Sequence, residues 1–179
     1  MINKWNFQTP SEEELHKRDQ LVAELGFSPV ICLLLVQRGI TSIEEAKKFF
    51  KPSLNDLHDP FLMPDMDKAV RRLNKALGNK EKILIYGDYD VDGTTAVSLV
   101  FKYLRPYSST LDFYIPDRYD EGYGISYKGI DYAAENGVSL VISLDCGIKA
   151  IEKIEYAKEK GIDFIICDHH MPDATLPDA

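Results

Sequence analysis

Cysteine is scarce in this chain of 179 residues. The three that occur, Cys32, Cys146 and Cys167, are odd in number and lack the CxxC spacing of a metal-binding pair. A disulfide framework and a structural zinc site are therefore not expected. Each cysteine lies within or beside an apolar run, which predicts a small buried side chain at all three positions.

Long hydrophobic runs are also absent. No stretch reaches the roughly 18 consecutive apolar residues that suggest a membrane-spanning helix. The N-terminal residues Met1–Trp5 lack the apolar core of a secretion signal. We therefore expect no membrane contact and a cytoplasmic location.

Positive charge is the third deficit. The chain has 21 Lys and Arg against 29 Asp and Glu, which gives a net charge of −8. Proteins that hold nucleic acid through bulk charge are usually basic. Any contact with nucleic acid must therefore be local, be made through a metal, or be made by residues outside this chain.

The first 64 residues show helical patterns separated by short breaks. Ser11 and Glu14 fit a capping box that opens a helix toward Leu25. A second apolar stretch covers 28–35, and a third helix is expected to end near Phe50. Small amphipathic helices of this kind usually provide packing or interaction surface. We expect residues 1–64 to form a helical lead segment without chemistry of its own.

From Asp65 onward the pattern changes to short apolar runs that alternate with helices, after one longer helix over 65–77. The apolar runs are 82–86, 110–115, 139–144 and 163–167, and the helical patterns lie near 94–104, 127–135 and 150–160. This alternation predicts βαβ units and an α/β fold with a parallel β-sheet flanked by helices. Ligands of such sheets bind beyond the carboxyl ends of the strands.

Polar clusters follow three of the four apolar runs. After the first run, Asp88, Asp90 and Asp92 stand at alternate positions. Because three adjacent carboxylates repel one another, a fold tolerates them only where a cation compensates their charge or water solvates it. Oxygen-rich clusters of this kind suit magnesium or manganese.

The third run ends in Asp145, and the fourth ends in Asp168, His169 and His170. One strand–helix unit separates Asp145 from Asp168, so we expect them at the tips of neighbouring parallel strands. Carboxylates and imidazoles that converge on one edge of a sheet are typical of a two-metal hydrolytic site.

Other interpretations of these clusters fit less well. An EF-hand loop that began at Asp88 would need a glutamate at its twelfth position, which is Leu99 here. The segment 90–94 matches the D-x-D-G-T of haloacid-dehalogenase-type phosphatases, but 87–89 separate it from the strand and the later histidines have no place in that family. Taken singly, a solvated acidic turn, a helix cap at Asp145 and surface histidines would be ordinary. Their common order at strand ends favours one site.

The ordered set resembles the DHH phosphoesterase superfamily, which is named for the triad seen here at 168–170. Within it, the chain is similar to the RecJ-type single-strand-specific DNA exonucleases. The likeness is carried by 88–93 and by 116–124, together with the upstream segments 52–54 and 59–66. It covers nearly the whole chain. It implies a DHH-type core after the helical lead segment.

The resemblance also implies metal ligands. Asp90 and Asp92 would ligate separate ions, Asp145 would bridge both ions, and His169 would ligate the second. Manganese or magnesium would fill the site. Several DHH relatives, such as family II pyrophosphatases, carry a His four residues before the first ligand, where this chain has Tyr86. The first metal is therefore expected to have fewer ligands within this stretch.

The remaining triad residues would have catalytic roles by the same resemblance. His170 would face the scissile phosphate or orient the attacking water. Asp168 would ligate a metal or hold the histidines in place. Asp88 would support the metal ligands through contacts around them.

The resemblance and the residue types together suggest a substrate-binding loop. Arg118 is placed to contact a phosphate, and Gly122 and Gly124 would allow close approach of the backbone. Tyr123 would stack on a base or pack within the protein, and both interpretations stay open. The expected partner is single-stranded DNA, while protein partners in recombination or repair are not identified.

The implied activity is metal-dependent hydrolysis of single-stranded DNA from the 5′ end to mononucleotides, in recombination and repair. A further metal-ligating Asp and a second domain follow this region in the family. We therefore expect 65–179 to be the first part of a catalytic domain, truncated before its fourth motif, with little nuclease activity alone. The alternatives are a DHH enzyme for a small substrate (an oligonucleotide, cyclic dinucleotide or pyrophosphate) and a non-catalytic binding module.

Overall fold

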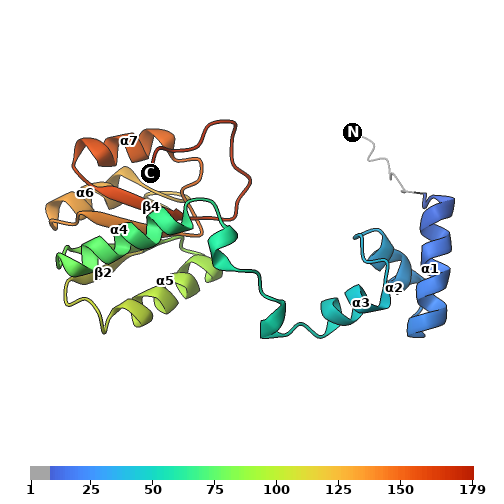
Figure 1. Ribbon diagram of the computed structural model, residues 1–179. Coiled ribbons are helices and arrows are strands. Elements are labelled where there is room, and N and C mark those ends of the chain that lie inside the picture. Colours follow the sequence, from blue (N-terminus) through green and yellow to red (C-terminus); the bar gives the residue numbers. More distant parts are fainter. Residues whose placement is uncertain (1–8) are drawn as a thin grey trace, which may run out of the picture. The chain divides into compact units, whose positions relative to one another are not determined.

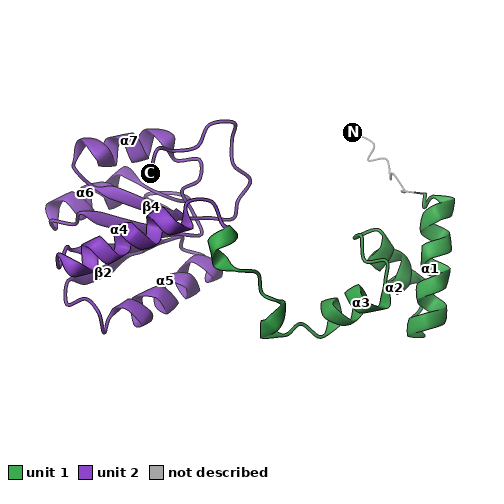
Figure 2. Ribbon diagram, in the orientation of Figure 1, with its two compact units in different colours: residues 1–62 green, residues 63–179 purple. Residues whose placement is uncertain are grey.

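A computed structural model describes residues 9–179. Its contacts group into two compact units that divide between Leu62 and Met63 (Figure 2). Within the described part of the chain, no helix combines the length and apolar character needed to cross a bilayer.

Three helices form the first unit, and each begins after a serine cap whose side chain accepts a backbone N–H (Figure 1). They are α1 (Glu12–Leu25), α2 (Pro29–Val36) and α3 (Ile43–Phe50), followed by the short 3-10 helices η1 (Leu54–Asp56) and η2 (Pro60–Leu62). Ser11 and Glu14 form the predicted capping box, and α1 ends at Gly26 with a left-handed φ of 68°. The expected helical segment at the N-terminal side is confirmed, whereas the two 3-10 helices were not predicted.

A parallel sheet of four strands, in the order β2-β1-β3-β4, forms the second unit. Its elements are α4 (Met66–Gly78), β1 (Ile83–Gly87), α5 (Val91–Leu104), β2 (Leu111–Tyr114), α6 (Tyr127–Glu135), β3 (Leu140–Leu144), α7 (Ile151–Glu159) and β4 (Asp163–Cys167). The predicted α/β fold is confirmed.

Helices cover both faces of this sheet, which explains why β1 and β3 are buried at every position and mostly apolar (Figure 1). Ile83 and Ile85 point to the face covered by α4 and α5. Leu84 and Tyr86 point to the opposite face, where they pack with residues of α6 and α7. Because successive side chains of a strand alternate between faces, both faces need apolar residues.

The strand register brings the polar clusters to one edge of the sheet. Gly87 at the end of β1 pairs with Leu144 of β3, and Leu144 pairs with Cys167 of β4. The Asp145 N–H donates to the carbonyl of Cys167 at 2.8 Å. Asp145 therefore lies at the tip beside that of Asp168, as the sequence predicted.

Two local expectations were wrong. Cys167 is exposed, whereas Cys32 and Cys146 are buried, and all three thiols are free. Among the described residues, β4 has a neighbouring strand on one side only, so the end of β4 is open to solvent. The helix expected to begin at Thr94 begins three residues earlier, because Asp90 caps it.

Arg72 of α4 ties the amino ends of the sheet strands together. Its guanidinium donates to Asp163 at 2.6 Å and to Glu81 at 2.7 Å, and the side chains of Arg72 and Glu81 are only 20% and 18% exposed. We expect Arg72→Ala to lower the free energy of unfolding by about 1–3 kcal/mol, since Glu81 loses its cationic partner. Urea unfolding of the purified chain measures this.

The neighbouring Arg71 provides a matched control. Its ion pair with Asp67 joins two side chains that are both more than half exposed, so Arg71→Ala should cost less than about 1 kcal/mol. The hydrogen bond from Arg72 holds the pKa of Glu81 below its ordinary value of 4.5. The stabilisation from the Arg72–Glu81 pair is therefore present above pH 4.5 and is lost as the pH falls through the lowered pKa of Glu81. The difference in free energy of unfolding between wild type and Arg72→Ala should shrink over the same range. Equal losses from the two variants at neutral pH would contradict this account.

Candidate metal centre

The turn after β1 carries the first acidic cluster. Asp88 is fully buried, and neither of its carboxylate oxygens has a hydrogen-bond partner among residues 9–179. Asp90 is the N-cap of α5, where one carboxylate oxygen accepts the N–H groups of Asp92 and Gly93 at 3.0 Å each. Asp92 lies exposed in the first turn of that helix. Capping uses one oxygen of Asp90 and leaves the other available.

Gly93 makes this turn possible. A Cβ atom at this position would lie 2.5 Å from the carbonyl oxygen of Asp88 and 2.6 Å from its amide nitrogen. Only glycine allows α5 to approach the end of β1 so closely.

We expect Gly93→Ala to lower the free energy of unfolding by about 1–3 kcal/mol, because the clash is with backbone that has no room to move. Gly78→Ala in α4 is the matched control. It has open space around its Cβ position, so alanine there should be neutral or stabilise by up to about 1 kcal/mol. Thermal unfolding of both variants tests this. Equal changes in melting temperature would show that α5 does not approach the end of β1 closely at Gly93.

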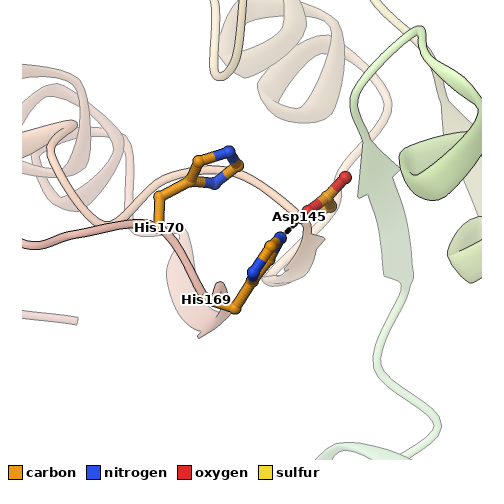
Figure 3. A group of neighbouring side chains, drawn as sticks. All are labelled: Asp145, His169 and His170. Carbon is orange, nitrogen blue, oxygen red and sulfur yellow. Dashed lines mark ion pairs between the residues drawn. The ribbon is translucent and has the colours of Figure 1, made fainter. Parts of the chain in front are cut away.

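Asp145, His169 and His170 form a compact group of ligand atoms that all lie within 4.8 Å of one another (Figure 3). Nε2 of His169 is 3.0 Å from Oδ1 of Asp145. The side chain of Asp145 is 11% exposed, and its φ of 62° is left-handed, a conformation that Asp tolerates better than most residues. The structure thus brings the acid that follows β3 together with the two histidines that follow β4.

His170 is held from both sides of its ring. Nδ1 lies 2.6 Å from Oδ1 of Asp168, and Nε2 lies 3.1 Å from the hydroxyl of Tyr123. The other oxygen of Asp168 accepts the N–H of Ile148 at 3.0 Å. Burial alone would raise the pKa of Asp168, but the hydrogen bonds from Ile148 and His170 hold that pKa below its ordinary value. The hydrogen bond to Asp168 in turn raises the pKa of His170.

Cys146 shows how concentrated the negative charge is. Its pKa is raised to about 12, first by burial and then by the carboxylates of Asp88, Asp168, Asp145 and Asp90. The buried thiol therefore stays neutral in the middle of four acids. The sequence did not point to Cys146, because its position among these acids depends on the packing of three strands.

The residues present fit a divalent cation. Asp88 offers two buried oxygens that have no hydrogen-bond partner in the described part of the chain, and the cluster of Asp145, His169 and His170 adds carboxylate and imidazole donors. This mixture of donors suits manganese, and the oxygen-rich part also suits magnesium. Asp90 and Asp92, which were expected to be ligands, lie outside this group of three.

Tyr86, which stands where some DHH relatives carry a histidine, contacts a loop. Its hydroxyl donates to the carbonyl of Gly124 at 3.0 Å and accepts the N–H of Ser126 at 3.1 Å. Burial raises the pKa of Tyr86, so the hydroxyl keeps its proton. Tyr86 thereby fastens the loop that carries Tyr123 to the end of β1.

The expected substrate-binding residues lie beside this centre. The guanidinium of Arg118 is 5.3 Å from the ring centroid of Tyr89, which in turn lies edge-on to Tyr123. Gly122 and Gly124 have left-handed φ values of 80° and 78°, which explains why glycine stands at both positions. Tyr89 was not predicted, although it lies inside the first acidic motif. The binding roles of Arg118, Gly122, Tyr123 and Gly124 stay predictions.

A cavity of about 590 Å³ opens beside His170. Its walls combine apolar side chains with two lysines and the Asp168–His170 pair; the lining residues are Tyr123, Gly124, Ile125, Gly147, Ile148, Lys149, Ala150, Lys153, Asp168, His170 and Met171. The centre therefore has open space next to it.

Comparison with known proteins agrees with this geometry. The "single-stranded-DNA-specific exonuclease RecJ" of Bacillus subtilis (strain 168) is 41% identical over 175 residues, which cover 98% of this chain and 22% of the relative. The RecJ of Escherichia coli (strain K12) is 33% identical over 168 residues, which cover 93% of this chain and 29% of the relative. The chain thus spans less than a third of the length of these relatives.

Solved structures show the same likeness. A crystal structure of exonuclease RecJ bound to manganese has a TM-score of 0.57 at 32% identity, covering 62% of this chain and 28% of that one. RecJ in complex with Mn²⁺ from Thermus thermophilus has a TM-score of 0.65 at 25% identity, covering 92% of this chain and 22% of that one. The family described as "DHH family, N-terminal domain" matches residues 82–179. With this match and these relatives, the chain belongs to the DHH family.

Proposed function

We propose that this chain is part of a metal-dependent phosphodiesterase that degrades single-stranded DNA from the 5′ end to mononucleotides, in recombination and repair. The observation that carries the proposal is the group of Asp145, His169 and His170 beside the buried carboxylate of Asp88, which has no hydrogen-bond partner among the residues that the structure describes. The substrate follows from the relatives named RecJ. Because those relatives are several times longer, we assign the full activity to a longer protein. In it, 65–179 form the first part of the catalytic domain, after a helical lead segment over 1–64.

In this proposal the acidic edge of the sheet holds two divalent ions. Asp90, Asp92 and Asp145 would provide carboxylate oxygens, with Asp145 shared between the two ions, and His169 would provide an imidazole. Asp88 supports them from the buried side. Bound Mn²⁺ or Mg²⁺ would supply Lewis-acid neutralisation of phosphate charge and a lowered pKa for a water molecule. A chain with a net charge of −8 repels a polyanion, so the proposal makes DNA binding depend on these cations.

The chain's own residues orient the substrate. His170 lines the cavity, and Asp168 holds its Nδ1, so the ring would face the scissile phosphate or orient the attacking water from a fixed position. The cavity beside His170 has room for a nucleotide, and Lys149 and Lys153 on its wall suit a phosphate. A cytoplasmic location is part of the same proposal.

The test uses the full-length protein that carries these residues. Oligonucleotides labelled at one end and blocked at the other are incubated with Mn²⁺ and, separately, with a chelator. Stepwise release of mononucleotides from a free 5′ end, with duplex DNA spared and no release in chelator, supports the proposal. Cleavage of dinucleotides or pyrophosphate without attack on long strands would instead give a DHH enzyme for a small substrate. Metal binding without any hydrolysis would give a binding module.

A further inference from the structure

Tyr123 contacts the candidate catalytic histidine through its hydroxyl, although the two residues are 47 positions apart. The hydroxyl lies 3.1 Å from Nε2 of His170, and the two rings meet edge-on at 5.9 Å. The contact joins the loop before α6 to the loop after β4. It therefore depends on how each loop is held.

The tyrosine loop is held by a network of hydrogen bonds. One carboxylate oxygen of Glu121 accepts the hydroxyl of Tyr114 at 2.9 Å and also that of Ser126, and the other accepts the N–H of Asp117 at 2.8 Å. The hydroxyl of Tyr86 adds the bonds to Gly124 and Ser126 described above. The segment 117–126 is thus closed by two buried or half-buried anchors, and Tyr123 lies inside it.

The backbone also directs Tyr123. Gly122 and Gly124, on either side of it, have left-handed φ values of 80° and 78°. Two such residues reverse the chain sharply before and after Tyr123. The two reversals hold the side chain of Tyr123 in one position, next to His170. An ordinary surface turn does not need two such residues.

The hydroxyl completes the hydrogen bonding of the His170 ring. An ionised Asp168 only accepts hydrogen bonds, so Nδ1 of His170 carries the proton that it shares with Asp168. Nε2 then has a single described partner, the hydroxyl of Tyr123. A ring held at both nitrogens cannot rotate freely, and a catalytic imidazole depends on that orientation.

We infer that Tyr123 is a positioning residue that fixes the ring of His170 through its hydroxyl, and that Glu121 and Tyr86 hold the loop that delivers it. The inference rests on the proposed function for its kinetic consequence. It differs from the expectation that Tyr123 stacks on a base, because stacking uses the ring and positioning uses the hydroxyl.

Two substitutions separate the roles. Tyr123→Phe keeps the ring and removes the hydroxyl, and Tyr123→Leu removes both. In the full-length protein with Mn²⁺ and single-stranded DNA, we expect Tyr123→Phe to lower kcat about ten- to a hundredfold with little change in KM. Tyr119→Phe is the control, since Tyr119 belongs to the same loop and is 96% exposed. If Tyr123→Phe matches wild type while Tyr123→Leu raises KM, Tyr123 stacks on the substrate and the inference is wrong.

The loop anchor has its own test. Glu121→Gln should lower kcat in the same way, and adding Tyr123→Phe to it should cause little further loss, because both changes release the same ring. If the losses of kcat from the two substitutions add up in the double variant, Glu121 does not act through Tyr123.

A readout without substrate distinguishes failure of the inference from failure of the proposed function. Nitrogen-15 NMR of the metal-free chain reports the proton and the hydrogen bond at each nitrogen of His170. Asp168 keeps the proton on Nδ1 in every variant, so we expect the Nε2 resonance to shift in Tyr123→Phe, where Nε2 loses its hydrogen bond, and to stay in place in Tyr119→Phe. An unchanged His170 spectrum in Tyr123→Phe would overturn the inference, whatever the enzyme hydrolyses.

Discussion

Replacing Asp145 by asparagine in the full-length protein is expected to lower the rate of DNA hydrolysis at least about a thousandfold. Asp145 is the one acid within the group of candidate ligand atoms, and its carboxylate is largely shielded from water beside His169. Asparagine keeps the size and the tolerance for left-handed backbone but loses the charge. Single-turnover hydrolysis with Mn²⁺ measures the effect.

The choice of substitution separates chemistry from folding. Asp145→Ala should lose the same activity and, in addition, about 1–2 kcal/mol of stability, since alanine is strained at a φ of 62°. Asp67→Asn is the control, because Asp67 is an exposed acid of α4 that pairs with Arg71. A loss of tenfold or less in Asp145→Asn would mean that Asp145 does not lie between the metals.

Asp88→Asn is expected to change stability and activity in opposite directions. The buried carboxylate has no described hydrogen-bond partner, so in the absence of metal its charge destabilises the fold. Removing that charge should raise the free energy of unfolding of the chelated chain by about 1–3 kcal/mol. The same change should weaken Mn²⁺ binding and lower the rate of hydrolysis by about a hundredfold.

Urea unfolding with chelator and with Mn²⁺ tests this prediction. Wild type should gain stability from Mn²⁺, because the ion binds the folded state, and Asp88→Asn should gain less. Asp131→Asn is the control, since that carboxylate is satisfied by Tyr156 and Lys160, which lie in and just after α7. If Asp88→Asn instead lowers the free energy of unfolding of the chelated chain, Asp88 has a structural role.

The strands and the edge that carries the site were predictable from sequence. Apolar runs of five or six residues that are followed by acids mark the carboxyl ends of buried parallel strands, and β3 and β4 match those runs within one residue. One strand–helix unit between Asp145 and Asp168 then implies neighbouring tips. The register confirms this, because Leu144 pairs with Cys167.

Contacts that depend on tertiary packing were not predictable. The start of α5 was placed too late, because a glycine at position 93 resembles a turn residue. Only the structure shows that a larger side chain there would clash with the backbone of Asp88, so that this helix needs glycine. Cys167 was expected to be buried because the sequence does not reveal that β4 lies at the edge of the described sheet. The contact of Tyr123 with His170 joins two loops with no common pattern, so no periodicity could indicate it.

Anomalous diffraction from crystals grown with Mn²⁺ tests the central claim most directly. We predict an anomalous peak within coordination distance of the Asp145 carboxylate and Nε2 of His169, on the side of Asp88, so that the metal replaces their direct contact. Ordered Mn²⁺ elsewhere, or Asp145 and His169 still paired at 3.0 Å with no peak between them, would contradict the assignment of this edge as a metal centre.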